Sequence, residues 1–269
     1  MIGWRVEGVI GGYRTLWTSH LSDSERADFI SGVRRCYGAH DASSALPADA
    51  RDGAERLHFL VRDHDGGACA GFSVRLCRAT DVSIVEPWGL EAQRVRARLI
   101  DAVGDAGVVA EACCAWADRA SGQRDVAQSG GDVTPSDILA AQPPLVFGLL
   151  FPRTRAMVCI SADHSVGRWL RSGARPVDGV DSAPWPDARY ATVPLCWRRE
   201  GLARRMDGRL AAIALSQMES QGFSMSVSVW RMFGYAQPHS LNTTEGSEGV
   251  SVSAFDARVR AQGIDSEEK

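Results

Sequence analysis

The sequence predicts an α/β fold built on a mixed sheet, and two observations support this. Residues 57–62 and 70–77 have the composition of strands and flank the turn sequence DHDGG at 63–67, a pattern typical of an antiparallel hairpin. Around this hairpin, strand-like and helix-like stretches alternate along the chain. Such alternation favours a sheet in which helices accompany strands of mixed direction.

Caps and composition place the elements of the first half. Ser22 and the acids that follow it cap a helix that runs to about Cys36. Residues 41–52 are small and polar and contain proline, which indicates a loop. The first twenty residues, rich in glycine and aromatic side chains, indicate no particular element. The other elements expected up to residue 135 are a short helix within 89–103, a strand over 108–116 and a loop over 121–135.

Proline and glycine divide the second half. A helix-like stretch opens at Ser136, and Pro143 with Pro144 must break or kink it. A compact strand over 156–161 leads into a helix over 163–171, which ends before a glycine. The remaining expected elements are a strand over 191–197, a helix over 199–221 and a candidate strand over 224–230.

The composition is that of a globular protein and argues against several functions. The 269 residues are 45% hydrophobic and 23% charged, with a net charge of −3. This chain lacks the excess of positive charge that bulk nucleic-acid binding requires. It shows neither a secretory signal nor an apolar stretch long enough for a membrane span. Lys269 is the only lysine, which argues against Schiff-base chemistry.

The cysteines indicate reduced thiols rather than a structural framework. Their number is odd and no C-x-x-C occurs, so neither disulfides nor a zinc site is expected, and no metal. We therefore expect a cytoplasmic protein with mostly buried thiols. The seven cysteines are at positions 36, 69, 77, 113, 114, 159 and 196.

Charged residues in unusual places are the candidates for chemistry. Asp49 and Asp52 lie three apart in a loop, where acids often simply form turns. Arg75 lies inside an apolar strand, so it either reaches solvent or is held by carboxylates. Glu111 is flanked by apolar residues; burial would raise its pKa and suit it to act as a general base. The alternative is an edge-strand charge that opposes aggregation.

The order of these groups resembles the LuxI-type acyl-homoserine-lactone synthases (autoinducer synthases), a branch of the GNAT-like acyltransferases, over residues 25–198. No single motif is specific, and order and spacing support the resemblance. The matching positions are Arg34 near the end of the first helix, Asp49 and Asp52 of an E-x-D-x-x-D motif, Ser73-Val74-Arg75-Leu76 as S-x-R-L, Glu111 of an E-x-x-R motif, and Arg171-Ser172-Gly173 before a return strand.

The resemblance implies a fold and a domain organisation. Residues 1–198 would form a GNAT-like three-layer α-β-α sandwich around a mixed, mostly antiparallel sheet. Residues 199–236 would add a C-terminal helix and an extra strand, and residues 237–269 a polar, flexible tail.

The resemblance also implies an activity. The enzyme would move a fatty acyl group from acyl carrier protein (or acyl-CoA) to the amine of S-adenosylmethionine. Ring closure would then release methylthioadenosine and give an N-acyl-homoserine lactone, a quorum-sensing signal. Glu111 would be the catalytic base, with Arg34, Asp49, Asp52 and Arg75 binding the substrate. Both partners of the reaction are substrates, and no permanently bound cofactor is expected.

The expected donor is acyl carrier protein, because the pyrophosphate-loop pattern Q/R-x-x-G-x-G/A of ordinary GNAT enzymes does not occur in the sequence. Arg168, Arg171 and Arg175 would offer an acidic carrier a basic landing surface. The alternative is a solvated helix face, with Val166, Trp169 and Leu170 turned inward.

Two departures from the family pattern keep other functions open. Cys114 stands where the E-x-x-R motif has arginine, and Pro47 where the acidic motif has glutamate. One alternative is an N-acyltransferase that makes an open-chain N-acyl amino acid or amine. The second is a non-catalytic member of the fold that binds an acyl ligand or a partner.

Overall fold

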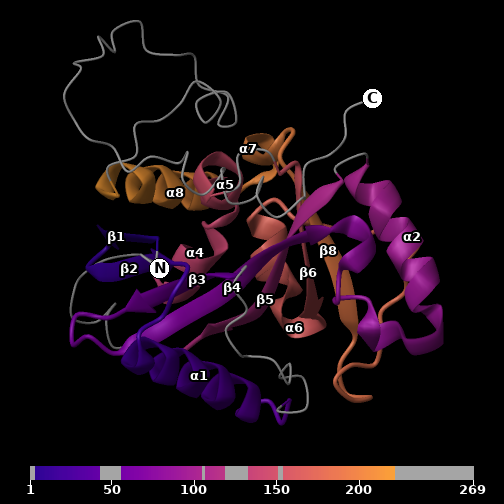
Figure 1. Ribbon diagram of the computed structural model, residues 1–269, viewed down its shortest axis with the longest axis horizontal. Coiled ribbons are helices and arrows are strands. Elements are labelled where there is room, and N and C mark those ends of the chain that lie inside the picture. The colour runs from indigo at the N-terminus through magenta and orange to yellow at the C-terminus, as the bar shows by residue number, and fades with distance from the viewer. Residues whose placement is uncertain (1–3, 43–55, 105–106, 119–132, 151–153, 222–269) are drawn as a thin grey trace, which may run out of the picture.

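The computed structural model describes residues 4–42, 56–104, 107–118, 133–150 and 154–221, and Figure 1 shows their path. In these ranges the strands form an eight-stranded sheet in the order β1-β2-β3-β4-β5-β6-β8-β7. Every neighbouring pair in it is antiparallel except β5 and β6, which are parallel. The strands are β1 (Arg5–Ile10), β2 (Tyr13–Thr18), β3 (Arg56–Arg62), β4 (Ala68–Arg78), β5 (Val108–Ala117), β6 (Ala156–Ala162), β7 (Arg175–Pro176) and β8 (Thr192–Arg198).

Helices cover both faces of the sheet. On one face, α1 (Asp23–Gly38) and α2 (Ala92–Val103) each bury an apolar side against the strands. On the other, α4 (Pro135–Ala140), α6 (Asp163–Arg171) and α8 (Gly208–Ser220) share the largest core cluster with β3 and β4. This is the predicted three-layer α-β-α sandwich around a mixed, mostly antiparallel sheet. The shorter turns of helix are Ala79–Asp81, Glu86–Glu91, α5 (Pro143–Leu145), Val146–Leu150 and α7 (Leu202–Arg205).

The predicted hairpin is confirmed as β3 and β4, whose register pairs Phe59 with Phe72. A second hairpin, β1–β2, went unpredicted at the N-terminus. Its turn is Gly11-Gly12, whose φ angles of 56° and 84° suit the two-residue turns that favour glycine. A glycine pair between two strand-like runs is the signal that would have located it.

The predicted helix over 199–221 is split in the structure. It ends at Arg205 in α7, and α8 begins after Asp207, whose side chain caps the Arg209 amide at 2.9 Å. The break predicted at Pro143 is confirmed, because α4 ends at Ala140 and Pro143 begins a new turn. The candidate strand at 224–230 lies outside the described residues.

Two local features define helix α1: a capping box at its N-terminus and a close contact between Gly32 and the sheet. Ser22 and Glu25 form a capping box at its N-terminus, as the sequence predicted. Near the middle, Trp116 of β5 lies so close to Gly32 that an added Cβ would meet its ring at 2.3 Å. Gly32 therefore allows the close approach that places the C-terminal half of α1 against β4 and β5.

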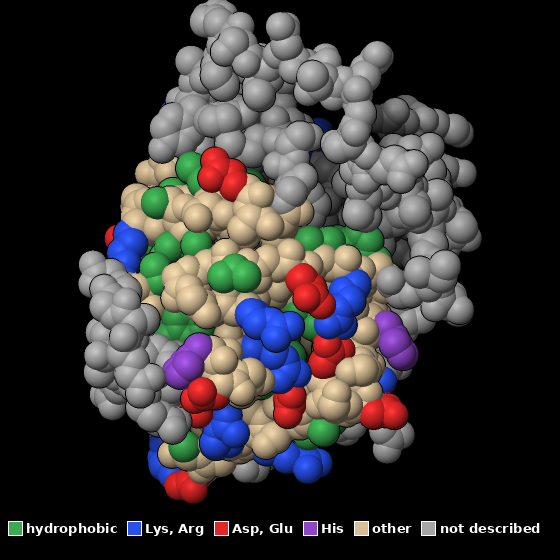
Figure 2. Space-filling model, turned by 90° about the vertical axis from the view of Figure 1, so that its left-hand side faces the viewer, with side chains coloured by type: hydrophobic (Ala, Val, Ile, Leu, Met, Phe, Trp, Pro, Cys, Tyr) green, Lys and Arg blue, Asp and Glu red, His purple; other side chains and the backbone are tan. Residues whose placement is uncertain are grey.

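The face that carries β1 and β2 has mixed surface chemistry. Figure 2 shows acidic and basic side chains next to each other there, with hydrophobic ones scattered between them. Among the described residues, no helix is long and apolar enough to cross a membrane.

Candidate functional site

Three charged side chains lie in one row across the face of the sheet that α1 and α2 cover. Arg56 of β3 pairs in register with Arg75 of β4, which pairs with Glu111 of β5. Directly opposite residues of an antiparallel pair project from the same face, so the three share one surface. We call Arg56, Arg75 and Glu111 the charged row.

A second row lies beside the first, two residues along each strand. His58 pairs with Ser73, and Ser73 pairs with Cys113. Nδ1 of His58 lies 2.9 Å from the hydroxyl of Ser73. Burial lowers the pKa of His58 to about 4, aided by the positive charges of Arg56 and Arg26, so its imidazole is uncharged at pH 7. We call His58, Ser73 and Cys113 the neutral row.

Glu111 holds the charged row together. Its Oε2 accepts from Nε of Arg75 at 2.7 Å and lies 2.6 Å from Nη2 of the same guanidinium. Its Oε1 accepts from the amide of Ser83 at 2.9 Å, the hydroxyl of Ser83 at 2.7 Å and the amide of Ile84 at 2.9 Å. Glu111 thus ties strands β4 and β5 to the loop that follows the Ala79–Asp81 turn.

This geometry changes the interpretation of Glu111. It is 1% exposed on an interior strand, so the edge-strand alternative is wrong. An ionised carboxylate offers about four acceptor sites, and donors from Arg75, Ser83 and Ile84 occupy them. These donors surround both oxygens of the Glu111 carboxylate. In this arrangement Glu111 positions Arg75, and its role as a general base stays a prediction.

Arg75 is held by a carboxylate, which was one of the two alternatives for it. Asp49 and Asp52, which the resemblance places with Arg75 in the substrate-binding site, both lie outside the described residues. Arg34 is exposed on α1, and no described interaction joins it to the charged row. The structure therefore brings together Arg75 and Glu111, and adds Arg56, which the sequence did not single out.

Strand β5 leaves its parallel neighbour just after the charged row. β5 and β6 pair only through Ala110 with Met157 and Glu111 with Val158. Beyond this point β5 contains a bulge against β4, and Cys114 in it has a φ of 54°. A positive φ is uncommon for a residue other than glycine, and such positions gather at functional sites.

Thiols and one phenol surround the point of separation. Cys113 and Cys114 lie on β5 and Cys159 on β6, and all three lie near the phenol of Tyr37 on α1. Burial raises the pKa of Tyr37, so the phenol stays protonated and is a hydrogen-bond donor. Its hydroxyl makes no hydrogen bond to the described residues. Sequence reasoning missed Tyr37, because nothing in the helix pattern marks it.

The three arginines predicted to dock a carrier differ in their surroundings. Arg171 lies 3.6 Å from Asp137 and 3.8 Å from Asp207, so its charge is largely engaged. The guanidinium of Arg168 lies over the Trp169 ring, and Arg175 is exposed on β7. Trp169 packs inward with 8% exposure and Val166 is half-buried, as the alternative for this helix required, but Leu170, also expected to face inward, is 41% exposed.

All seven cysteines are free thiols. The structure also gathers no group of three or more metal-ligating side chains among the residues it describes.

Comparisons with known proteins give structural similarity without a sequence match. No protein-family model matches the chain, and no curated protein matches it. The structure is similar to FeeM, an N-acyl amino acid synthase from uncultured soil microbes, with 11% identity, a TM-score of 0.49, and coverage of 77% of this chain and 98% of that one. It is similar to the acyl-homoserine-lactone synthase LasI, with 13% identity, a TM-score of 0.46, and coverage of 83% and 97%. It is also similar to MesI, a CoA-dependent acyl-homoserine lactone synthase, with 12% identity, a TM-score of 0.42, and coverage of 80% and 89%.

Proposed function

We propose that this protein is an N-acyltransferase that moves an acyl group from a carrier thioester to an amine. The observation that supports this most directly is the separation of β5 from β6 beside the charged and neutral rows. On one side of this separation lies β6. On the other side lie the charged and neutral rows of β3, β4 and β5. Acyl transfer from a thioester to an amine requires a site that binds two substrates next to each other, and the two sides of the separation would each bind one of them.

The donor would bind along the separating strands. Beyond Glu111 and Val158 the two strands no longer pair with each other. Backbone amide and carbonyl groups left unpaired between strands must find other partners, and an extended ligand can supply them as an added strand would. The pantetheine arm of a carrier has amides of this kind.

The proposed reaction is an acyl transfer that balances without a further reagent. The amine nitrogen attacks the thioester carbonyl carbon, the carbon–nitrogen bond forms, and the carbon–sulfur bond breaks. The leaving sulfur takes up the proton that the nitrogen loses. Tyr37 is placed among residues of both separating strands, so its phenol is our candidate to donate a hydrogen bond to the developing oxyanion or the leaving sulfur.

We propose S-adenosylmethionine as the acceptor and an N-acyl-homoserine lactone, a quorum-sensing signal, as the product. Asp49, Asp52 and Arg34 belong to this proposal as substrate-binding residues. An acidic acyl carrier protein would dock through Arg168 and Arg175, since Arg171 is engaged by two aspartates. Acyl-CoA is the alternative donor.

An open-chain N-acyl amino acid is the second candidate product. It is favoured by Cys114, because a thiol at the bulge replaces the positive charge of the family motif. Binding of an acyl ligand without turnover is the remaining alternative.

The test is mass spectrometry of lipid extracts from a host that expresses the protein, compared with the same host carrying an empty vector. A new acyl-homoserine lactone would support the first product, and a new open-chain N-acyl amino acid the second. The purified protein is then incubated with acyl carrier thioesters and with acyl-CoA. Formation of no amide in either experiment would contradict the proposed catalysis.

A further inference from the structure

Arg56 is a charged side chain without a charged partner in the described structure. It is the first residue of β3 and is half-buried. Its guanidinium reaches across β4 and donates from Nη1 to Sγ of Cys113 at 3.2 Å. None of the ion pairs found among the described residues includes Arg56. A guanidinium carries more N–H donors than this one contact uses.

The described neighbours of Arg56 in the two rows leave its charge uncompensated. In the charged row, Arg75 and Glu111 neutralise each other. In the neutral row, the His58 imidazole is uncharged at pH 7. A hydrogen bond to Cys114, together with burial, raises the pKa of Cys113 well above its usual value, so this contact is a neutral thiol. The two rows therefore carry one excess positive charge, and it lies on Arg56.

The position of this charge matters for the reaction. Contact with Cys113 places the guanidinium over β5, next to the bulge at Cys114, where β5 leaves β6. An anion bound there would lie beside the proposed site of acyl transfer. The planar fork of donors matches a carboxylate, and charge-assisted pairs of this type are among the stronger hydrogen bonds.

We propose that Arg56 binds the α-carboxylate of the acceptor, so that the acceptor is an α-amino acid or a derivative that keeps this carboxylate. This inference rests on the proposed function. Both candidate acceptors, S-adenosylmethionine and a free amino acid, have the amine and the carboxylate on the same carbon. Holding the carboxylate on Arg56 directs the amine toward the separation of β5 and β6. Lactone formation then requires the carboxylate to leave Arg56, whereas an open-chain product keeps it bound.

A binding experiment tests the inference without requiring turnover. The probes are N-dodecanoylglycine and N-dodecanoylglycinamide, which differ only in the carboxylate, measured against the full chain by calorimetry. A charge-assisted contact of about 1.5 to 3 kcal/mol predicts that the carboxylate probe binds roughly 10- to 100-fold more tightly. Arg56→Gln should reduce this preference to about threefold or less, and Arg56→Lys should keep part of it.

The matched control is Arg14→Gln, because Arg14 is exposed on β2 away from the rows. It should leave the preference unchanged. Arg56 makes no ion pair with the residues that the structure describes, so Arg56→Gln should keep the melting temperature within about 2 °C of the natural protein. If the natural protein binds both probes equally, or Arg56→Gln keeps the preference, the inference is wrong.

An acceptor assay separates failure of the inference from failure of the proposed function. S-adenosylmethionine, free amino acids and the corresponding amino acid amides are each offered with an acyl carrier thioester. Equal acylation of acids and amides would contradict the role of Arg56 and retain the acyltransferase. A carboxylate preference in binding, with no acylation of any acceptor, would retain the role of Arg56 and contradict the enzyme.

Discussion

Arg75 and Glu111 each supply the charge that allows the other to be buried. Glu111 is 1% exposed and the Arg75 side chain 28% exposed. Removing one partner of a buried pair leaves the other uncompensated, which costs more than the pair contributes when intact. The two side chains therefore act as a structural unit beneath the proposed acceptor.

Glu111→Gln should destabilise the fold by about 3 kcal/mol. Whichever way the amide is oriented, its NH2 group faces a donor, either Arg75 or the amides of Ser83 and Ile84. Urea unfolding measures the loss, and Glu86→Gln, at an exposed position, should show none. A variant with unchanged stability and acyl transfer reduced more than about tenfold would instead support Glu111 as the general base.

The sequence could predict the charged side chains of this site but not the groups that contact them. Arg75 and Glu111 stood out because charges are unusual inside apolar strands. The saturation of Glu111 could not be predicted, because its Oε1 partners are mainly backbone amides of Ser83 and Ile84, which no side-chain pattern marks. Arg56 was missed because an arginine at the start of a strand is ordinary until its neighbours are known.

Helix α1 is positioned by a close contact that only a residue without a side chain allows. The ring of Trp116 occupies the space where a Cβ of Gly32 would lie. Trp116 is 2% exposed and packs with Phe29 in an edge-on arrangement, with ring centroids 6.2 Å apart. Tyr37 lies five residues further along the same helix.

Gly32→Ala should therefore destabilise the protein by about 1 to 3 kcal/mol, because either the helix or the indole must move. Gly167→Ala is the matched control, since it also lies inside a helix but a Cβ there meets nothing within 4 Å. The control should be neutral or stabilise by about 0.5 to 1 kcal/mol, through the higher helix propensity of alanine. Chemical denaturation of both variants measures the difference. Equal effects would contradict the close contact.

Among the helices and strands, those next to a strong turn or proline signal were the ones that the sequence predicted best. The Asp-Gly-Gly turn located β3 and β4, and the proline pair located the break after α4. The division between α7 and α8 could not be predicted from composition, because Met206 and Asp207 interrupt a stretch of good helix formers. There the cap at Asp207 and the packing of Leu210 in the core outweigh helix propensity.

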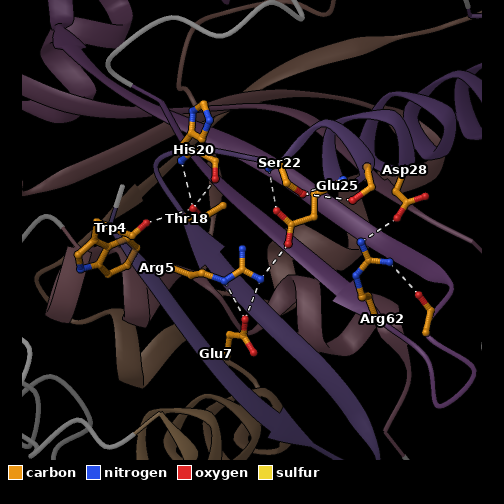
Figure 3. A network of polar contacts seen from close by, with 11 residues as sticks. Trp4, Arg5, Glu7, Thr18, His20, Ser22, Glu25, Asp28 and Arg62 are labelled. Carbon is orange, nitrogen blue, oxygen red and sulfur yellow. Dashed lines mark hydrogen bonds and ion pairs between the residues drawn. The ribbon is translucent and has the colours of Figure 1, made fainter. Parts of the chain in front are cut away.

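Across the whole molecule, an ion-pair network joins the edge of the sheet to the first helix. Figure 3 shows Arg5 of β1 between Glu7 and Glu25, with Glu25 also closing the capping box at Ser22. The Arg5 guanidinium lies 2.8 Å from the Glu25 carboxylate. Burial alone would raise the pKa of Glu25, but hydrogen bonds from Arg5 and Ser22 outweigh it and lower the pKa to about 2.

This lowered pKa predicts how stability depends on pH. A carboxylate with a folded pKa of about 2 and an ordinary value of 4.5 stabilises the fold above pH 4.5, and this contribution is lost as the pH falls toward 2. Glu25→Gln keeps the capping-box hydrogen bond and removes the charge. It should cost about 1 to 2 kcal/mol at pH 7 and progressively less below pH 4.5. Denaturation at several pH values measures this.

Glu219→Gln is the control, because Glu219 is exposed near the end of α8. It should leave the pH dependence of the natural protein unchanged. A difference between the natural protein and Glu25→Gln that is the same at pH 7 and pH 2.5 would show that the charge of Glu25 does not contribute.

The short pairing of β5 with β6 divides the sheet into two parts that share few main-chain hydrogen bonds. Strands β1 to β5 form one continuous antiparallel unit, and β6, β8 and β7 form another, so main-chain bonds tie the two units together over only two residue pairs. Arg56, Arg75 and Glu111 all belong to the first unit. Substitutions in the second unit would therefore reshape the proposed donor side and leave the proposed acceptor site intact. Selectivity for the two substrates would then evolve independently, each in its own half of the molecule.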